Sequence, residues 1–292
     1  MNALFALACA GFSGQVLAVG DWSLNGEMNA SGGTYSGSQL RDRVSGYGAT
    51  LSADYLERGG LTLGLSRSFV KMKPGSNDIK QSSVFTSGRM HLTPDSLPGR
   101  LTLRLDLHKV DNDDVSRDTD EVSAYAPQVA WLSPDRQTYM DLGYAKSRYQ
   151  NNLKVTQYTP TFGKGLNDGA DWMQFRAYLI DMSNAARAQG KSATFALESK
   201  WTHWFGPKGP IGLDNVRAGL LLGSRVYAVD PDGGSVSNLA DSQRGDFNVA
   251  GEWKLGQSSS ILAILGHGRF RNATLSNDYT LNYGYVSWSG KW

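Results

Sequence analysis

The chain has 292 residues, a formal net charge of +2 at pH 7, and a charged fraction of only 19%. A nearly neutral chain lacks the excess of lysine and arginine that contacts to many nucleic-acid phosphates require, so we expect no nucleic-acid partner. No apolar run reaches the ~20 residues of a membrane-spanning helix, which excludes a helical membrane protein but not a membrane barrel, whose lipid-facing and lumen-facing residues alternate.

The first residues predict a secretory signal peptide over 1–18, followed by a single domain over 19–292. Residues 2–18 are uncharged, small and apolar and end in Val16-Leu17-Ala18, although no lysine or arginine precedes them. The only cysteine, Cys9, lies inside this segment, and a lipoprotein site there is the alternative, with Ala where such sites usually carry Leu. Cleavage near Ala18 leaves a mature chain without disulfide or thiol chemistry, which suits an oxidising exterior.

The rest of the chain repeats one pattern, in which about ten residues alternate apolar and polar before a turn. Leu101 to His108 shows it best, with four leucines on one face and Thr, Arg, Asp and His on the other. Each segment has about the ~9–11 residues that cross a bilayer at a tilt, whereas strands of soluble proteins average ~5–6. The predicted strands cover approximately 20–30, 44–57, 61–72, 82–93, 100–111, 121–133, 137–149, 153–162, 171–182, 192–205, 215–228, 245–256, 259–271 and 279–292.

The connections predict that the two ends of the sheet differ. Short clusters of Gly, Pro, Asp and Ser, at 58–60, 94–99, 133–136, 206–210 and 256–258, reverse a chain tightly. They alternate with longer, polar connections at 31–43, 73–81, 112–120, 183–191, 229–244 and 272–278. This alternation places all short turns at one end and all long loops at the other.

The last ten residues, Tyr283 to Trp292, alternate and end in an aromatic residue. This ending resembles the C-terminal assembly signal of Gram-negative outer-membrane β-barrels, with Trp292 in place of the usual Phe. The resemblance implies an outer-membrane location, contact with outer-membrane lipid and lipopolysaccharide, and recognition of Val286, Trp288 and Trp292 on the lipid face by the barrel-assembly machinery. We therefore predict an all-β fold, an antiparallel transmembrane barrel of about 14 strands.

Two residues conflict with the strand assignment. Pro127 and Pro160 lie inside predicted strands, and proline cannot donate to a strand ladder. Each is expected to mark a bulge, a strand end or a misplaced boundary, and twelve strands is the alternative count. A secreted soluble β-sandwich is the alternative fold, which strand length, one-ended loops and the terminal aromatic residue disfavour.

In a membrane barrel, the face opposite the aliphatic one lines the lumen. Charges on the lipid face would cost about 2–4 kcal/mol each near the midplane, so their position opposite Leu, Val and Phe favours this arrangement. Charges of the two signs nearly balance, so we expect no clear ion selectivity. The predicted lumen-lining residues are Glu27, Asp54, Arg89, His91, Arg104, Asp106, His108, Asp141, Trp172, Arg176, Tyr178, Glu198, Lys200, Arg217, Arg225, Glu252 and Lys254.

These residues have two interpretations. They form either a network of salt bridges that holds the wall in shape or a water-filled, charged passage, and a barrel of about fourteen strands is too wide for side chains alone to fill. We therefore expect some aqueous space, although long loops that fold inward would close it. Trp172, Gln174, Arg176 and Tyr178 share one face and suggest a sugar-stacking surface, with an aromatic girdle and ordinary lumen filling as the simpler alternative.

The sequence gives little support for catalysis or metal binding. None of His91, His108, His203 and His267 begins a His-x-Ser pattern, the strand spacing that would join a serine nucleophile to its base. Asp106 and His108 share a face, as would a carboxylate that orients a histidine, but a charged lumen produces the same pattern by chance. The acidic loop Asp111-Asn112-Asp113-Asp114 lacks the residue order of a calcium loop. We predict no catalytic residues, no metal site and no cofactor, and expect the loop to share divalent ions with lipopolysaccharide phosphates.

The sequence therefore predicts an outer-membrane channel for passive or facilitated passage of small hydrophilic solutes, with both termini in the periplasm. One alternative is an export or assembly barrel for a polysaccharide or surface protein that works with a periplasmic partner. The others are an outer-membrane hydrolase and a purely structural barrel.

Overall fold

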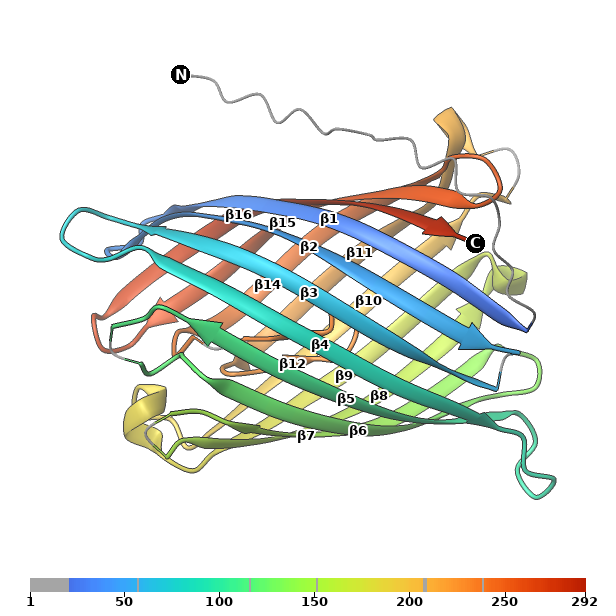
Figure 1. The fold of residues 1–292 in the computed structure, drawn as a ribbon, viewed down its shortest axis with the longest axis horizontal. Helices are drawn as coiled ribbons and strands as arrows, with labels where there is room; N and C mark the ends of the chain where they lie inside the picture. The colour runs from blue at the N-terminus through green and yellow to red at the C-terminus, as the bar shows by residue number, and fades with distance from the viewer. Residues whose placement is uncertain (1–20, 57, 116, 151, 207–208, 238) are drawn as a thin grey trace.

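The computed structural model of the protein describes residues 21–56, 58–115, 117–150, 152–206, 209–237 and 239–292. These residues form a closed antiparallel barrel of 14 strands, in which β1 pairs with β16 and every other neighbour is the next barrel strand along the chain (Figure 1). The predicted fold and the count of fourteen are confirmed, and twelve is wrong. The proposed signal peptide, with Cys9, lies outside the described residues.

The barrel strands are 11 to 15 residues long. Short 3-10 helices occur at Asn167–Gly169 (η1), Ala185–Ala188 (η2) and Pro210–Gly212 (η4). The barrel strands are β1 Trp22–Ser36, β2 Arg41–Tyr55, β3 Gly59–Met72, β4 Ile79–Leu92, β5 Arg100–Asn112, β6 Val122–Leu132, β7 Thr138–Arg148, β8 Lys154–Leu166, β9 Asp171–Met182, β10 Ala193–Trp204, β11 Leu213–Arg225, β14 Ser242–Lys254, β15 Ser259–Asn272 and β16 Asn277–Lys291.

The two ends of the barrel differ less than the sequence predicts. β1 starts and β16 ends at the same end of the barrel, which we call the turn end, and the opposite end is the loop end (Figure 1). The strict alternation of short and long connections is wrong, because 37–40, 149–153 and 273–276 at the loop end are as short as the turns. The strands extend into segments that polar composition had marked as loop. The longest loop-end connection is 226–241, between β11 and β14.

The outer surface of the barrel is apolar. Large aliphatic side chains point outward and are well exposed, including Leu61 at 61% and Leu265 at 68%. Such a continuous apolar surface is far larger than soluble proteins tolerate and suits the hydrocarbon of a bilayer.

Among the described residues, the structure contains no helix with the length and apolar character needed to cross a membrane.

The two prolines lie within strands, without the bulge, strand end or boundary shift that the sequence suggested. Pro127 pairs with Leu105 of β5, and on its other side the β6–β7 ladder stops after Tyr125 and resumes at Gln128 in the same register. Pro160 pairs with Leu142 of β7 and interrupts the β8–β9 ladder in the same way. Because each proline lacks a backbone N–H, the strand pairing is interrupted locally on one side of the proline. The pairing on its other side stays continuous and keeps the register.

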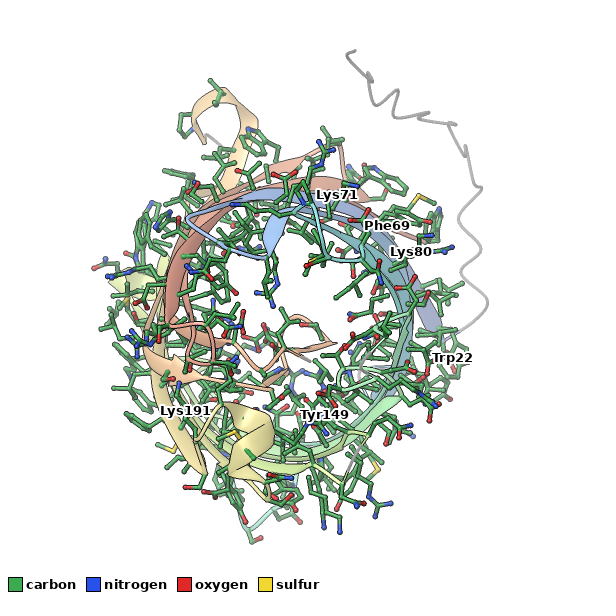
Figure 2. All side chains as sticks on the ribbon, turned by 90° about the vertical axis from the view of Figure 1, so that its left-hand side faces the viewer. Trp22, Phe69, Lys71, Lys80, Tyr149 and Lys191 are labelled. Carbon is green, nitrogen blue, oxygen red and sulfur yellow. The ribbon has the colours of Figure 1, made fainter. Side chains whose placement is uncertain are left out.

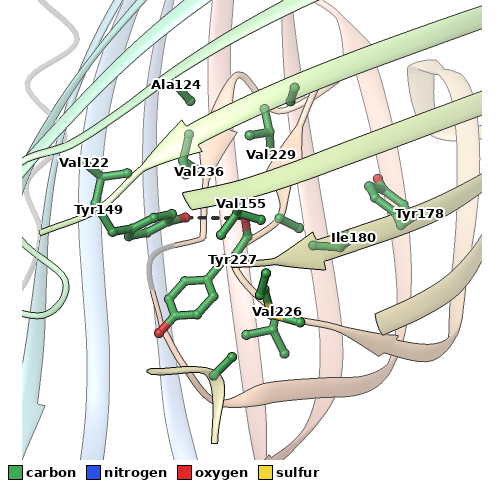
Figure 3. Close-up of a cluster of buried hydrophobic side chains, with 14 of the residues drawn as sticks. Val122, Ala124, Tyr149, Val155, Tyr178, Ile180, Val226, Tyr227, Val229 and Val236 are labelled. Carbon is green, nitrogen blue, oxygen red and sulfur yellow. Dashed lines mark hydrogen bonds between the residues drawn. The ribbon is translucent and has the colours of Figure 1, made fainter. Parts of the chain in front are cut away.

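The buried apolar core lies inside the barrel, on one side only. It joins inward residues of β5 to β11 with residues of the loop between β11 and β14 (Figure 3). Val110, Val122 and Ala124 contribute from the wall, and Val226, Tyr227 and Val229 from the loop. The loop is thus part of the folded core.

Candidate functional site

The loop between β11 and β14, described over residues 226–237 and 239–241, folds into the barrel as a hairpin, which we call the inner hairpin. Its strands are β12, Val229–Asp230, and β13, Ser235–Val236. The Gln157 side chain on β8 binds the Val229 backbone twice, donating to the carbonyl oxygen (2.7 Å) and accepting from the amide (3.0 Å). Arg104 on β5 donates to the carbonyl oxygen of Pro231 (2.9 Å). Because Gln157 lies on β8 and Arg104 on β5, the hairpin is fixed to the inner wall of the barrel at two separate strands.

The tip of the inner hairpin is held by an ion-pair network. Both terminal nitrogens of Arg176 donate to the carboxylate of Asp232, at 2.8 and 2.9 Å, and Lys200 Nζ donates at 2.6 Å. Arg176 and Lys200 also lie 3.7 and 3.2 Å from Glu198. Burial alone would raise the pKa of Asp232, but the charges of Lys200 and Arg176 outweigh it and hold that pKa well below its ordinary value. Asp232 is therefore ionised at neutral pH.

A second anchor, centred on Asp241, fixes the end of the loop. Its carboxylate forms an ion pair with Arg41 of β2 and accepts hydrogen bonds from Tyr279 (2.6 Å), Asn272 (2.8 Å) and Gln189 (2.9 Å). These partners come from β2, β16, β15 and the loop at 183–192. Such convergence ties the loop to the barrel rim.

Aromatic packing covers the inner hairpin at the loop end. The rings of Tyr149 and Tyr227 lie 4.7 Å apart, and the Tyr149 hydroxyl donates to the carbonyl oxygen of Ser237 (3.1 Å) and more weakly to that of Tyr227 (3.4 Å; Figure 3). The Tyr227 hydroxyl donates to the carbonyl oxygen of Arg187 (2.8 Å). Burial raises the pKa of Tyr227 to about 12 and that of Tyr149 well above its ordinary value, so both residues make these contacts as neutral phenols at physiological pH.

The wall formed by β1 to β4 carries small inward residues. Gly46, Gly48, Gly60 and Gly64 lie on the inner face of β2 and β3, and Ser66 of β3 shares a hydrogen bond with Ser83 of β4 (2.6 Å). Ser66 is exposed although it points inward. Figure 2 looks along the barrel from the loop end and shows clear space beside these strands, with the inner hairpin on the other side. We call the two parts of the interior the open side and the covered side.

The predicted inward residues divide between these two sides. Near the open side, Arg89 pairs with Asp54 and Arg217 with Glu252, and the Arg89 and Arg217 side chains keep 31% and 43% exposure. His91 bonds Thr102 (2.9 Å), and Lys254 pairs with Asp214 at the turn end. On the covered side, the side chains are buried or bound to the inner hairpin: Arg104, Asp106, His108, Asp141, Arg176, Tyr178, Glu198, Lys200 and Arg225.

The suggested sugar-stacking surface is not a continuous free surface. Arg176 is occupied by Asp232, and Tyr178 is fully buried beneath the ring-facing guanidinium of Arg225, 5.2 Å away. Trp172 lies against Gly163, where a Cβ would fall 2.5 Å from the ring. The contacts of Arg176 and Tyr178 agree with the alternative interpretation, in which these side chains fill the lumen.

Asp106 and His108 contact other side chains in the structure. Asp106 accepts from Arg104 Nε (2.8 Å), and the His108 ring packs on Phe85 with the centroids 5.0 Å apart. The shared strand face therefore reflects an ion pair and an aromatic contact.

The carboxylates of the acidic loop bind protein groups. Asp113 accepts from the Lys80 amide (2.6 Å), Asp114 from the Thr119 hydroxyl (3.0 Å), and Asp120 from the Asn112 amide (2.8 Å). Within the described ranges, no group of three or more His, Cys, Asp or Glu residues has the geometry to hold a metal ion.

The C-terminal residues close the barrel. Trp292 exchanges two backbone hydrogen bonds with Leu24 of β1 (2.8 and 3.0 Å), and its ring lies against Gly26, where a Cβ would be 3.0 Å away. Val286 is exposed on the outer face, and Trp288 follows it in the same phase. These residues lie along the seam where the last strand meets the first.

Sequence reasoning missed the acidic residues of the loop and of β14. The sequence pattern places Asp230, Asp232 and Asp241 in a polar external loop at 229–244, and Asp246 is not among the predicted lumen-lining residues. One signal was present, because Val229 and Val236 flank the turn residues Pro231-Asp232-Gly233-Gly234, a pattern typical of a hairpin.

Comparison with known proteins identifies the fold. No protein-family model matches the chain, and no curated protein matches it. Among solved structures, the deltaS2S3 mutant of TodX, a monoaromatic hydrocarbon channel, is 10% identical over 92% of this chain and 90% of its own, with a TM-score of 0.58. A bacterial polysaccharide outer membrane secretin is 9% identical over 91% and 98%, with a TM-score of 0.54. The Pseudomonas putida toluene transporter TodX is 9% identical over 92% and 88%, with a TM-score of 0.53.

Proposed function

We propose that the protein is a channel of the Gram-negative outer membrane that passes small hydrophilic solutes passively. The observation that carries this proposal is the open side of the interior, where Ser66 and the side chains of Arg89 and Arg217 remain accessible to water. Glycines on β2 and β3 supply the room there. The predicted inward residues near this side are proposed to line the passage.

The polarity of the open side favours hydrophilic solutes. Hydroxyl pairs such as Ser52 with Thr62 (2.9 Å) and Ser66 with Ser83 (2.6 Å) line it, beside the ion pair of Arg89 with Asp54. TodX carries hydrocarbons by its description, and a wall of this kind would be a poor path for them. The fold alone supports a channel and an exporter equally, and the polar wall favours a hydrophilic cargo over a hydrocarbon.

The location and the remaining partners belong to the same proposal. The apolar outer surface is proposed to contact outer-membrane lipid and lipopolysaccharide. Val286, Trp288 and Trp292, which lie at the barrel seam, are proposed to be read by the assembly machinery. We propose no enzymatic activity, because the pattern of Asp106 and His108 has a structural explanation.

Cysteine modification tests the channel. Wild-type protein and Ser66→Cys should both conduct in planar bilayers, and a charged methanethiosulfonate reagent should reduce the current of Ser66→Cys only. The matched control is Leu65→Cys, because Leu65 is the adjacent residue, points outward and is exposed to lipid. A wild type without conductance, or a Ser66→Cys current unaffected by the reagent, would overturn the proposal.

A further inference from the structure

The inner hairpin changes the charge of the barrel interior. By sequence, inward Arg and Lys nearly balance inward Asp and Glu. The loop brings the carboxylates of Asp230, Asp232 and Asp241 inside the barrel. These three carboxylates add one cation to the interior count, Arg41, which forms an ion pair with Asp241. Asp246 of β14 adds another inward carboxylate. Carboxylates therefore outnumber guanidinium and ammonium groups inside the described barrel.

On the covered side, Arg104, Arg176 and Lys200 form ion pairs with carboxylates. Arg104 binds Asp106, and Arg176 and Lys200 share Asp232 and Glu198. Arg225 is attracted electrostatically by Asp230, Glu198 and Asp246, but it lies over the Tyr178 ring and donates to Gln243 and forms no ion pair among the described residues. The three paired cations thus add little positive field to the passage, and Arg225 is held away from it over the Tyr178 ring.

On the open side, two carboxylates have no ion-pair partner among the described residues. The pairs of Arg89 with Asp54 and Arg217 with Glu252 cancel, whereas Glu27 and Asp246 form none. Glu27 accepts from the Tyr285 hydroxyl (2.7 Å) and Asp246 from the Tyr283 hydroxyl (2.9 Å). A phenol orients a carboxylate by its hydrogen bond but does not neutralise its charge.

Both carboxylates lie on one wall, formed by β14, β15, β16 and β1. Tyr283 and Tyr285 share the inner face of β16, with Glu27 on one flanking strand and Asp246 two strands away on the other. Tyr283 reaches Asp246 by lying across Gly266, where a Cβ would fall 2.2 Å from its ring. Gly266 thus allows the phenol to hold the carboxylate, and the wall presents two fixed negative charges.

We propose that the passage selects cations over anions, and that Glu27 and Asp246 set this preference. The inference rests on the proposed channel function and names its solute class as small inorganic or organic cations. Fixed charges in a narrow passage with low-dielectric walls act on permeating ions far more strongly than exposed surface charges do. Tyr283 and Tyr285 are positioning residues in this arrangement.

The reversal potential under a KCl gradient tests the inference. Wild type should show a potassium-to-chloride permeability ratio above one. Glu27→Gln with Asp246→Asn should bring the ratio toward one, because the amides keep the shape and the phenol hydrogen bonds but remove both charges. The matched control, Lys71→Gln with Asp78→Asn, removes an exposed neutral pair (2.9 Å) outside the barrel interior and should leave the ratio unchanged.

The outcomes separate the two proposals. A wild type that conducts with a ratio at or below one overturns the cation preference and leaves the channel standing. A conducting double amide variant with an unchanged ratio overturns the assignment to Glu27 and Asp246. Absence of conductance in wild type overturns the channel and the inference together.

Discussion

Replacing Asp232 by Asn is expected to loosen the inner hairpin and raise the conductance of the channel. Breaking one partner of a fully buried ion pair costs about 3–5 kcal/mol. The Arg176 side chain is 2% exposed, but that of Asp232 is 41% exposed, so water screens the pair and the cost is lower. Because the amide oxygen still accepts one hydrogen bond, we expect a loss of about 2 kcal/mol. That loss lowers the ratio of docked to undocked hairpin about 30-fold.

Single-channel recording of wild type and Asp232→Asn measures this change. The variant should show more frequent transitions to a larger conductance, because an undocked hairpin exposes the covered side to water. Asp78→Asn is the control, since Asp78 is an exposed loop carboxylate that binds Lys71 (2.9 Å) away from the hairpin. Arg176→Gln should add little to Asp232→Asn, because both remove the same contact. Equal conductance and equal noise in wild type and Asp232→Asn would refute the argument that this contact holds the hairpin.

Two further predictions concern the seam and pH. Trp292→Ala should lower the yield of folded barrel, measured by heat-modifiable gel migration, whereas Trp292→Phe keeps a ring over Gly26 and should not; equal yields would contradict a role for the ring. Asp232, in the loop rather than in a spanning strand, has a pKa held below its ordinary 3.8, so its contribution to docking is complete above pH 3.8 and is lost as pH falls through the lower, folded-state value. Conductance should therefore stay constant from neutral pH down to pH 3.8 and rise only in stronger acid. A rise near neutral pH would argue against this ion pair.

The sequence alone determines the barrel and its two faces. Strand residues alternate between faces at every position, so the pattern from Leu101 to His108 already separates lipid from lumen without knowledge of the partners. Arg104 and Asp106 are inward for the same reason. The strand count follows from the repeats of this local pattern, and the two prolines disturb it little because the neighbouring ladders keep the register.

Only the tertiary structure decides what the interior contains. Composition marks residues 229–244 as a polar loop but does not say on which side of the wall the loop folds. The answer depends on partners remote in the chain, since Arg176 lies 56 residues from Asp232, and Arg41 lies 200 residues from Asp241. Barrel closure brings these groups together, and the buried charges of Arg176 and Arg41 are paired with carboxylates that the loop carries inward, to which Glu198 of β10 adds for Arg176. The division into an open and a covered side, and the sign of the charge that faces the open side, follow from those long-range contacts.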